Sequence, residues 1–289
     1  MENMIILQVI LSGITAGLVY GLISIGLSLI WGIMDMVNFA HADFMMLSMY
    51  FAYVAWSKFA LDPMYSLPII IILMFVIGIV VYRNIVRKTV GGEIVTQILA
   101  TFGIVVFLQN MAQFIWSANY QMIRNPIVSG SFELGDLFLH KAQVVSGAAS
   151  LITAWLIWIF IHKTKLGWAL QATAQNRGAA PLIGINVNNM FSLAWGIGLA
   201  SVGVAGVLLA NYYYIFPQVG ATFQLLALVA VALGGFGSIP GALLAGLTVG
   251  IVEALSGFFI EPAYKYVVVF SLYIIVVLIR PQGLFGTHH

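Results

Sequence analysis

Cysteine is absent from this chain of 289 residues, and charge is scarce, because only 7% of the residues are Asp, Glu, Lys or Arg. The absence of cysteine excludes disulfides, thiolate metal sites and a cysteine nucleophile. With 62% hydrophobic residues and a mean hydropathy of +1.06, the chain has too little polar surface to fold as a soluble globule. Its net charge of +2 is too small to indicate a nucleic-acid partner.

Motifs for chemistry on this chain are missing as well. No Gly-x-x-x-x-Gly-Lys-Ser/Thr sequence occurs, so the chain does not bind ATP through a P-loop. No His-Glu-x-x-His sequence occurs, and no acidic pair shares a helix face inside an apolar segment. We therefore expect no catalytic residues, no metal site and no cofactor bound by this chain.

Long apolar runs dominate what is present. Several reach the roughly 20 residues that are needed to cross the hydrocarbon core of a bilayer. The sequence predicts an all-α polytopic transmembrane helical bundle, embedded in membrane lipid, that forms a single transmembrane domain over residues 1–289. The segments expected to cross lie at about 5–31, 38–57, 65–86, 94–117, 143–162, 191–214, 222–236, 239–258 and 263–280.

The seventh and eighth segments are the weakest, and GGFGSIPG (Gly234–Gly241) joins them. Gly and Pro at this density are typical of a tight turn between two helices. They are equally compatible with a broken or re-entrant helix that places backbone groups of Gly235, Gly237 and Ser238 beside a solute path. The sequence leaves both interpretations open, and with them the choice between eight and nine crossings.

Basic residues predict the orientation of the bundle. With nine crossings and the N-terminus outside, seven of the eleven Lys and Arg residues fall on the cytoplasmic side, where positive charge is enriched. We therefore expect the N-terminus outside and the C-terminus in the cytoplasm. The seven are Arg83, Arg87, Lys88, Lys163, Lys165, Arg177 and Arg280, whereas Lys58, Arg124, Lys141 and Lys265 fall outside.

Small residues recur every four positions in the first and eighth segments. Such stripes allow two helix backbones to approach closely in lipid, so they predict a compact bundle. The stripes are formed by Gly13, Gly17 and Gly21 in the first segment and by Ala242, Gly246, Gly250 and Ala254 in the eighth.

Two polar features interrupt the apolar segments. Asn38 and His41 share a helical face, so they either border a solute path or cap a helix start at the cytoplasmic interface. Glu253 is an acid well inside a late segment. An acid there either belongs to a solute path or lies in water near the outer end of its helix.

A mostly polar stretch, residues 163–190, lies in the cytoplasm by the charge argument. Within it, ALQATAQNRGAAPLIG (Ala169–Gly184) predicts one short helix that is rich in small residues and has no large apolar face. A short helix held at the membrane by two crossings suits docking into a groove on a cytoplasmic partner. The alternative is a solvated connecting loop.

The sequence AQNRGAAPLIGIN (Ala174–Asn186) resembles the cytoplasmic coupling loop of bacterial ABC-importer permeases, whose pattern is Glu-Ala-Ala, three residues and Gly. Ala179, Ala180 and Gly184 keep that spacing, and Gly178 stands in the place of the Glu.

Longer stretches resemble the branched-chain amino acid ABC transporter permease family, and most closely its shorter, LivH-type subunit. They cover nearly the whole chain. In order they are Gly17–Tyr50, Gly184–Ala210, Gly234–Leu255 and the terminal RPQGLFG (Arg280–Gly286).

This resemblance implies an importer in the bacterial inner membrane that works by ATP-driven alternating access. Its other parts would be a second permease (a LivM-type subunit or a second copy), two ATPases that bind ATP and Mg²⁺, and an external solute-binding protein. A urea or short-chain amide permease, an ion-coupled secondary transporter and a passive channel are the alternatives. The resemblance assigns ATPase docking to Gln175, Asn176, Arg177, Gly178, Ala179, Ala180 and Gly184.

Overall fold

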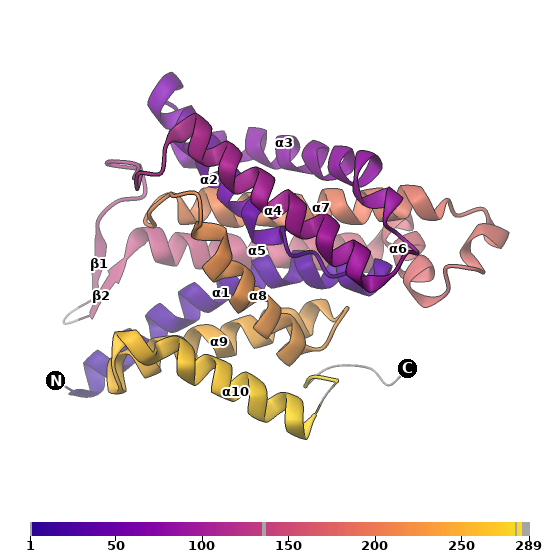
Figure 1. Cartoon of the computed structure of the whole chain (residues 1–289). Helices are drawn as coiled ribbons and strands as arrows, with labels where there is room; N and C mark the ends of the chain where they lie inside the picture. Colours follow the sequence, from indigo (N-terminus) through magenta and orange to yellow (C-terminus); the bar gives the residue numbers. More distant parts are fainter. Residues whose placement is uncertain (1, 135–136, 281, 285–289) are drawn as a thin grey trace.

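The computed structural model describes residues 2–134, 137–280 and 282–284, which form a helical bundle with one small β-hairpin (Figure 1). The predicted all-α polytopic fold class is confirmed. Of the terminal RPQGLFG motif, Pro281, Phe285 and Gly286 lie outside the described residues, as does Thr287–His289.

Ten α-helices and three short 3-10 turns make up the described helical structure. The helices are α1 (Glu2–Met34), α2 (His41–Phe59), α3 (Pro63–Asn84), α4 (Ile94–Trp116), α5 (Lys141–Lys163), α6 (Lys165–Gln175), α7 (Val187–Leu209), α8 (Val219–Gly234), α9 (Ile239–Phe259) and α10 (Lys265–Ile279). The 3-10 turns are η1 (Val86–Lys88), η2 (Ala180–Ile183) and η3 (Pro262–Tyr264).

Seven of the described helices are long and apolar enough to cross a membrane, namely α1, α3, α4, α5, α7, α9 and α10. α8 is apolar but shorter, and α2 is not among the seven. Every position of α2 from His41 to Tyr50 is buried, so α2 is a core helix that other helices surround. Each predicted segment coincides with one helix, and the number of crossings stays a prediction.

The two ends of the bundle carry different features. Strands β1 (Ser131–Leu134) and β2 (Leu137–His140) form an antiparallel hairpin in which Ser131 pairs with His140. This hairpin lies at the same end as the N-terminus, and α6 lies at the opposite end (Figure 1). We call these the hairpin end and the α6 end.

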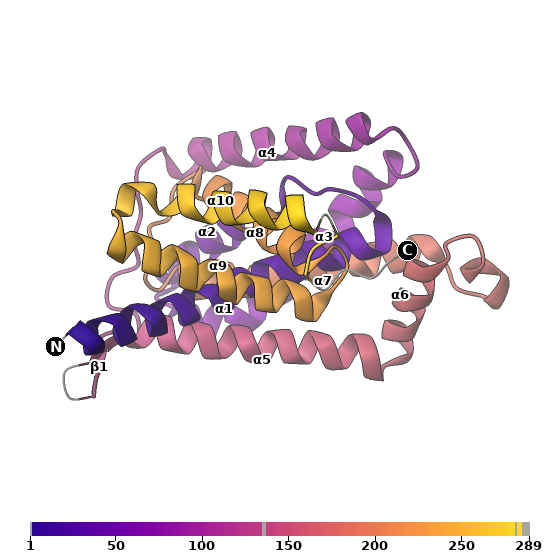
Figure 2. The same ribbon diagram turned by 90° about the horizontal axis from the view of Figure 1, so that it is seen from below.

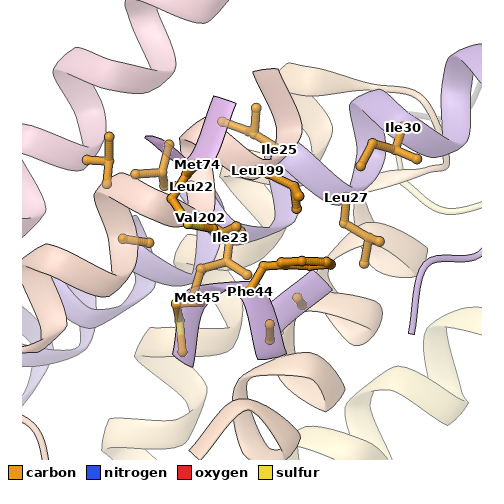
Figure 3. Close-up of a cluster of buried hydrophobic side chains, with 14 of the residues drawn as sticks. Leu22, Ile23, Ile25, Leu27, Ile30, Phe44, Met45, Met74, Leu199 and Val202 are labelled. Carbon is orange, nitrogen blue, oxygen red and sulfur yellow. The ribbon is translucent and has the colours of Figure 1, made fainter. Parts of the chain in front are cut away.

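Helix α1 runs through the centre of the bundle. Residues 21–30 are buried on every face, so this part of α1 shows no amphipathic pattern. Figure 3 shows its apolar side chains packed with residues from three other helices. Labelled there are Leu22, Ile23, Ile25, Leu27 and Ile30 of α1, Phe44 and Met45 of α2, Met74 of α3, and Leu199 and Val202 of α7.

The two glycine stripes face each other and bring α1 and α9 to backbone contact. A Cβ added at Gly13 would lie 2.9 Å from the carbonyl oxygen of Gly250, and one at Gly17 would lie 2.8 Å from the Cα of Leu247. A Cβ at Gly250 would overlap the backbone of Gly17. Because lipid offers no hydrophobic drive for helix association, this close packing is a main source of cohesion between the two helices.

Replacing Gly250 by alanine therefore tests the packing of α1 on α9. We expect Gly250→Ala to destabilise the bundle by about 1–3 kcal/mol, the usual cost of overpacking, and to lower its midpoint of thermal unfolding in detergent. Gly257→Ala is the matched control, because a Cβ at Gly257 on the same helix meets its nearest atom only at 3.9 Å. Equal midpoints for the two variants would contradict this description of the interface.

Candidate functional site

Helix α2 begins in the middle of the bundle. The ring Nε2 of His41, its first residue, donates to the carbonyl oxygen of Ile23 at 3.1 Å, and Ile23 lies well inside α1. Residues 35–40 lead back from the end of α1 to this point without helical structure. Both Asn38 and His41 are fully buried within the chain, and their two interpretations, as the border of a solute path or as a capped helix start, stay predictions. Non-helical backbone at such depth is stable only where protein or a cavity covers it.

Gln224 of α8 supplies the hydrogen bonds that this non-helical backbone needs. Its Oε1 accepts from the N–H of Ala42 at 2.9 Å, and its Nε2 donates to the carbonyl oxygen of Asn38 at 3.1 Å. The side-chain oxygen of Asn38 accepts from the N–H of Ala40 at 3.0 Å. Since a buried backbone group without a partner costs about 1–3 kcal/mol, these bonds allow α2 to start at this depth.

Helix α8 begins beside the start of α2. A Cβ at Gly220 would lie 2.8 Å from the carbonyl oxygen of Ala42 and 2.9 Å from Oδ1 of Asp43, so the glycine allows the two first turns to touch. Asp43 is 1% exposed, and its Oδ1 accepts from Nε2 of Gln109 in α4 at 2.8 Å. We call the set Asn38, His41, Asp43, Gln109 and Gln224 the polar centre.

The polar centre has hydrogen-bonding capacity that the described residues do not use. Nδ2 of Asn38 and Nδ1 of His41 are both buried without a partner in the described part of the chain. Because the N–H at Nε2 of His41 donates a hydrogen bond to a carbonyl oxygen, Nδ1 of the neutral ring is an acceptor. The centre thus retains one donor and one acceptor for water or a polar solute.

Sequence analysis placed Asn38 and His41 here but missed Gln109, Asp43 and Gln224. Gln109 and Gln224 are polar residues inside otherwise apolar predicted segments, which was the available signal. Asp43 lies two residues after His41 and so points to another face of α2, and the structure shows that this face is also buried against other helices.

The other predicted path residues lie elsewhere. Gly235 and Gly237 have φ values of +90° and +80° and form a turn between α8 and α9 at the α6 end. The hydroxyl of Ser238 accepts from the N–H of Gly241 at 3.1 Å and caps α9. Phe236 stacks on Trp31 with the ring centroids 4.1 Å apart, which holds the turn against the end of α1.

Glu253 forms an ion pair toward the hairpin end. Its Oε1 accepts from Nζ of Lys265 at 2.6 Å, and the residue is 7% exposed. Glu253 lies toward the end of its helix but is buried and paired rather than in water, and its assignment to a solute path stays a prediction. The pair fixes the start of α10 to α9.

The predicted coupling helix is interrupted. The side-chain oxygen of Asn176 accepts from the N–H groups of Gly178 at 3.0 Å and Ala179 at 2.9 Å, which is a local turn that competes with helix. Gly184, with φ +84°, ends the 3-10 turn η2 that follows. The expectation of one continuous helix over 169–184 is therefore wrong, and α6 and η2 form two separate pieces.

Two side chains of α6 fix it to the end of α5. Nε1 of Trp168 donates to the carbonyl oxygen of His162 at 2.9 Å. Nε2 of Gln171 donates to the carbonyl oxygen of Ile161 at 2.6 Å. Because these carbonyls belong to the last turn of α5, where they have no helical partner, the bonds make a stiff joint between the two helices.

Arg177 connects the same loop to α1. Its Nη2 lies 2.6 Å from Oδ2 of Asp35, and its Nε donates to the carbonyl oxygen of Ile33 at 3.2 Å. Ile33 is in the last turn of α1, and Asp35 opens the segment 35–40 that leads into the polar centre. One side chain therefore links the exposed loop to the end of α1 and to the beginning of the segment that leads into the polar centre.

The exposed surface of the loop is partly apolar, contrary to the expectation from sequence. Leu182 and Ile183 in η2 are 86% and 72% exposed, and Trp168 is exposed as well. Apolar side chains gathered at an exposed tip mark contact with another protein or with a membrane. Among the residues predicted to dock, Ala180 is buried and Arg177 is partly covered, whereas Gln175, Asn176, Gly178, Ala179 and Gly184 are exposed.

A hollow of about 600 Å³ opens at the hairpin end. It lies between the loop of residues 122–130, the start of α5 and the residues that follow α7. Its polar border includes Arg124, His140, Gln143 and Asn211. The chain thus has a distinct surface feature at each end of the bundle.

A multi-helix bundle with a buried polar centre and a stiffly attached exposed loop is the architecture of a transport permease. The chain matches, over residues 9–277, the family described as "Branched-chain amino acid transport system / permease component", and it belongs to that family.

Two relatives match almost end to end. The chain is 33% identical to the high-affinity branched-chain amino acid transport system permease protein BraD of Pseudomonas aeruginosa, and 31% identical to the corresponding LivH protein of Salmonella typhimurium. Each alignment covers 97% of this chain and 95% of the relative.

A solved structure supports the fold. PsaBC from Streptococcus pneumoniae in complex with Fab matches with a TM-score of 0.51 and 14% identity, covering 94% of this chain and 91% of that one. At this identity the likeness concerns the fold alone.

Removing the amide of Gln224 tests the polar centre. We expect Gln224→Met to leave the N–H of Ala42 and the carbonyl of Asn38 unpaired, and to destabilise the bundle by roughly 2–4 kcal/mol. Thermal unfolding in detergent measures the change. Gln218→Met, at an exposed position just before α8, is the control and should leave the midpoint unchanged. The same midpoint for both variants would show that the bonds of Gln224 do not support the start of α2.

Proposed function

We propose that this permease imports branched-chain amino acids across the bacterial inner membrane by ATP-driven alternating access. Its partners in this proposal are a second permease, two cytoplasmic ATPases and an external solute-binding protein. ATP and Mg²⁺ bind to the ATPases, and this chain contributes no catalytic residues. The observation that carries the proposal is the connection of the exposed loop, through Arg177, to the segment that enters the polar centre.

Nucleotide-driven movement needs a stiff contact between ATPase and permease. The loop of α6 and η2 offers an apolar tip at Leu182 and Ile183 and two attachments to the bundle, at the end of α5 and at the end of α1. A displacement of the tip therefore acts on residues 35–40 and on Asn38 and His41. ATP binding would select one of two bundle conformations by its different affinity for each.

The charge distribution supports an orientation with the α6 end in the cytoplasm. The seven basic residues that the sequence assigned to the cytoplasmic side lie at or near the α6 end, and the other four lie toward the hairpin end. The seven are Arg83, Arg87, Lys88, Lys163, Lys165, Arg177 and Arg280. Positive residues are enriched on cytoplasmic loops. In this orientation the hollow at the hairpin end faces the solute-binding protein.

The family and the two relatives favour branched-chain amino acids over urea or short-chain amides. An ion-coupled transporter or a channel would work without ATPases, and neither explains a loop attached in this way. The second permease is either a LivM-type subunit or a second copy of this chain.

Purification in mild detergent from the native membrane tests this assembly. We expect P-loop ATPases and a second permease to copurify with the tagged chain, and cells that carry the assembly to take up leucine, isoleucine and valine. A chain that arrives alone, under conditions that keep other transporter complexes intact, would contradict the proposal. Uptake of urea in place of the amino acids would overturn the substrate.

Charge at the apolar tip tests docking. We expect Leu182→Glu and Ile183→Glu each to reduce ATP-dependent leucine uptake more than about tenfold, because placing an acid in a docking contact costs on the order of 2 kcal/mol or more. Immunoblotting should show normal amounts in the membrane. Asn84→Asp, an exposed acid introduced at the end of α3, is the control. Normal uptake by both tip variants would remove the tip from the mechanism.

A further inference from the structure

Helix α4 carries three amide side chains in its second half, although most of the helix is apolar. They are Gln109, Asn110 and Gln113, in a helix long and apolar enough to cross a membrane. Polar side chains in such segments normally face the bundle interior or a water-filled cavity, because lipid cannot satisfy their hydrogen bonds. Within this chain Asn110 and Gln113 face neither the bundle interior nor a cavity, since both are exposed on its surface.

The three amides run from the polar centre to the surface of the chain. Gln109 is half-buried and donates to Asp43, so it faces inward. Gln113 follows one turn later and Asn110 lies farther around the helix, toward the side opposite the buried residues. Asn110 donates from Nδ2 to the carbonyl oxygen of Val106 at 2.7 Å, which leaves its side-chain oxygen on the exposed face.

The same face has room beside it. Thr96, Gly103 and Asn110 are seven residues apart and therefore lie on one side of α4. A Cβ added at Gly103 would meet no atom within 4 Å. In Figure 2, α4 lies along one edge of the bundle, with α5 at the opposite edge. No described helix of this chain covers Asn110 or Gln113.

We propose that the face of α4 bearing Gln109, Asn110 and Gln113 forms one wall of the solute passage, so that the polar centre opens onto the surface of this chain. This inference rests on the proposed function, and it places the passage alongside α4. Neutral amides both donate and accept hydrogen bonds. They can therefore contact the carboxylate and the ammonium of a passing amino acid without holding either ion tightly.

Cysteine accessibility tests the wall, and the natural absence of cysteine makes every introduced thiol unique. We expect Asn110→Cys and Gln113→Cys, in membranes containing the whole assembly, to react with a water-soluble methanethiosulfonate. Saturating leucine and its binding protein should slow or speed that reaction. Ile115→Cys is the control, because Ile115 is exposed on the other flank of α4, away from Asn110 and Gln113, and should face lipid without reacting.

Two results would overturn the inference. Unreactive thiols at both Asn110 and Gln113 would mean that the amides face lipid or packed protein. A disulfide between Asn110→Cys of this chain and of a second copy would assign the face to helix packing. A cross-link from Asn110→Cys to another permease, with no reaction with the methanethiosulfonate, would do the same.

Transport by the same variants separates this inference from the proposed function. We expect Asn110→Leu and Gln113→Leu each to raise the KM for leucine uptake about fivefold, as the loss of one neutral hydrogen bond implies, while Ile115→Leu leaves it unchanged. Unchanged KM values for both amide variants contradict the wall. Failure of the unsubstituted assembly to transport leucine would instead overturn the proposed substrate, whatever the labelling pattern.

Discussion

Hydrogen bonding of backbone deep inside an apolar bundle is the constraint on which the rest of this structure depends. Both α2 and α8 begin at that depth, and neither start can use water as a partner. The side chain of Gln224 pairs with the carbonyl oxygen of Asn38, just before α2, and with the N–H of Ala42, in the first turn of α2. Gly220 lets the start of α8 lie against the same turn. The polar centre is thus the solution to a folding constraint, and we propose it as the place where a polar solute finds hydrogen-bond partners.

The position of the polar centre explains how events at one end of the bundle can reach it. Arg177 joins the α6 end to Asp35, and the chain from there to Asn38 is non-helical and free of internal helical bonds. Such a segment changes its backbone angles at lower cost than a helix does. The close glycine contact of α1 with α9 keeps α1 itself in place. In the proposed mechanism, movement of the loop would therefore act on residues 35–40 rather than bend α1.

The sequence allowed the fold class, the nine helical positions and a compact bundle with two glycine stripes to be predicted, because composition and periodicity are local properties. That the two stripes face each other was visible only in the structure. It allowed Asn38 and His41 to be singled out as polar residues in an apolar setting. It did not allow their depth to be predicted, because depth depends on Gln224, which is distant in sequence. The break at Asn176 was missed for a different, local reason, since a side-chain turn overrode helix propensity there.

Transport by the purified assembly in liposomes tests the central claim most directly. Leucine accumulation would be measured with the ATPases and the binding protein present, with and without ATP, and under imposed Na⁺ or proton gradients. The account predicts accumulation that requires ATP and the binding protein and does not respond to either gradient. Accumulation driven by a gradient, in liposomes that contain this chain without ATPases, would contradict it.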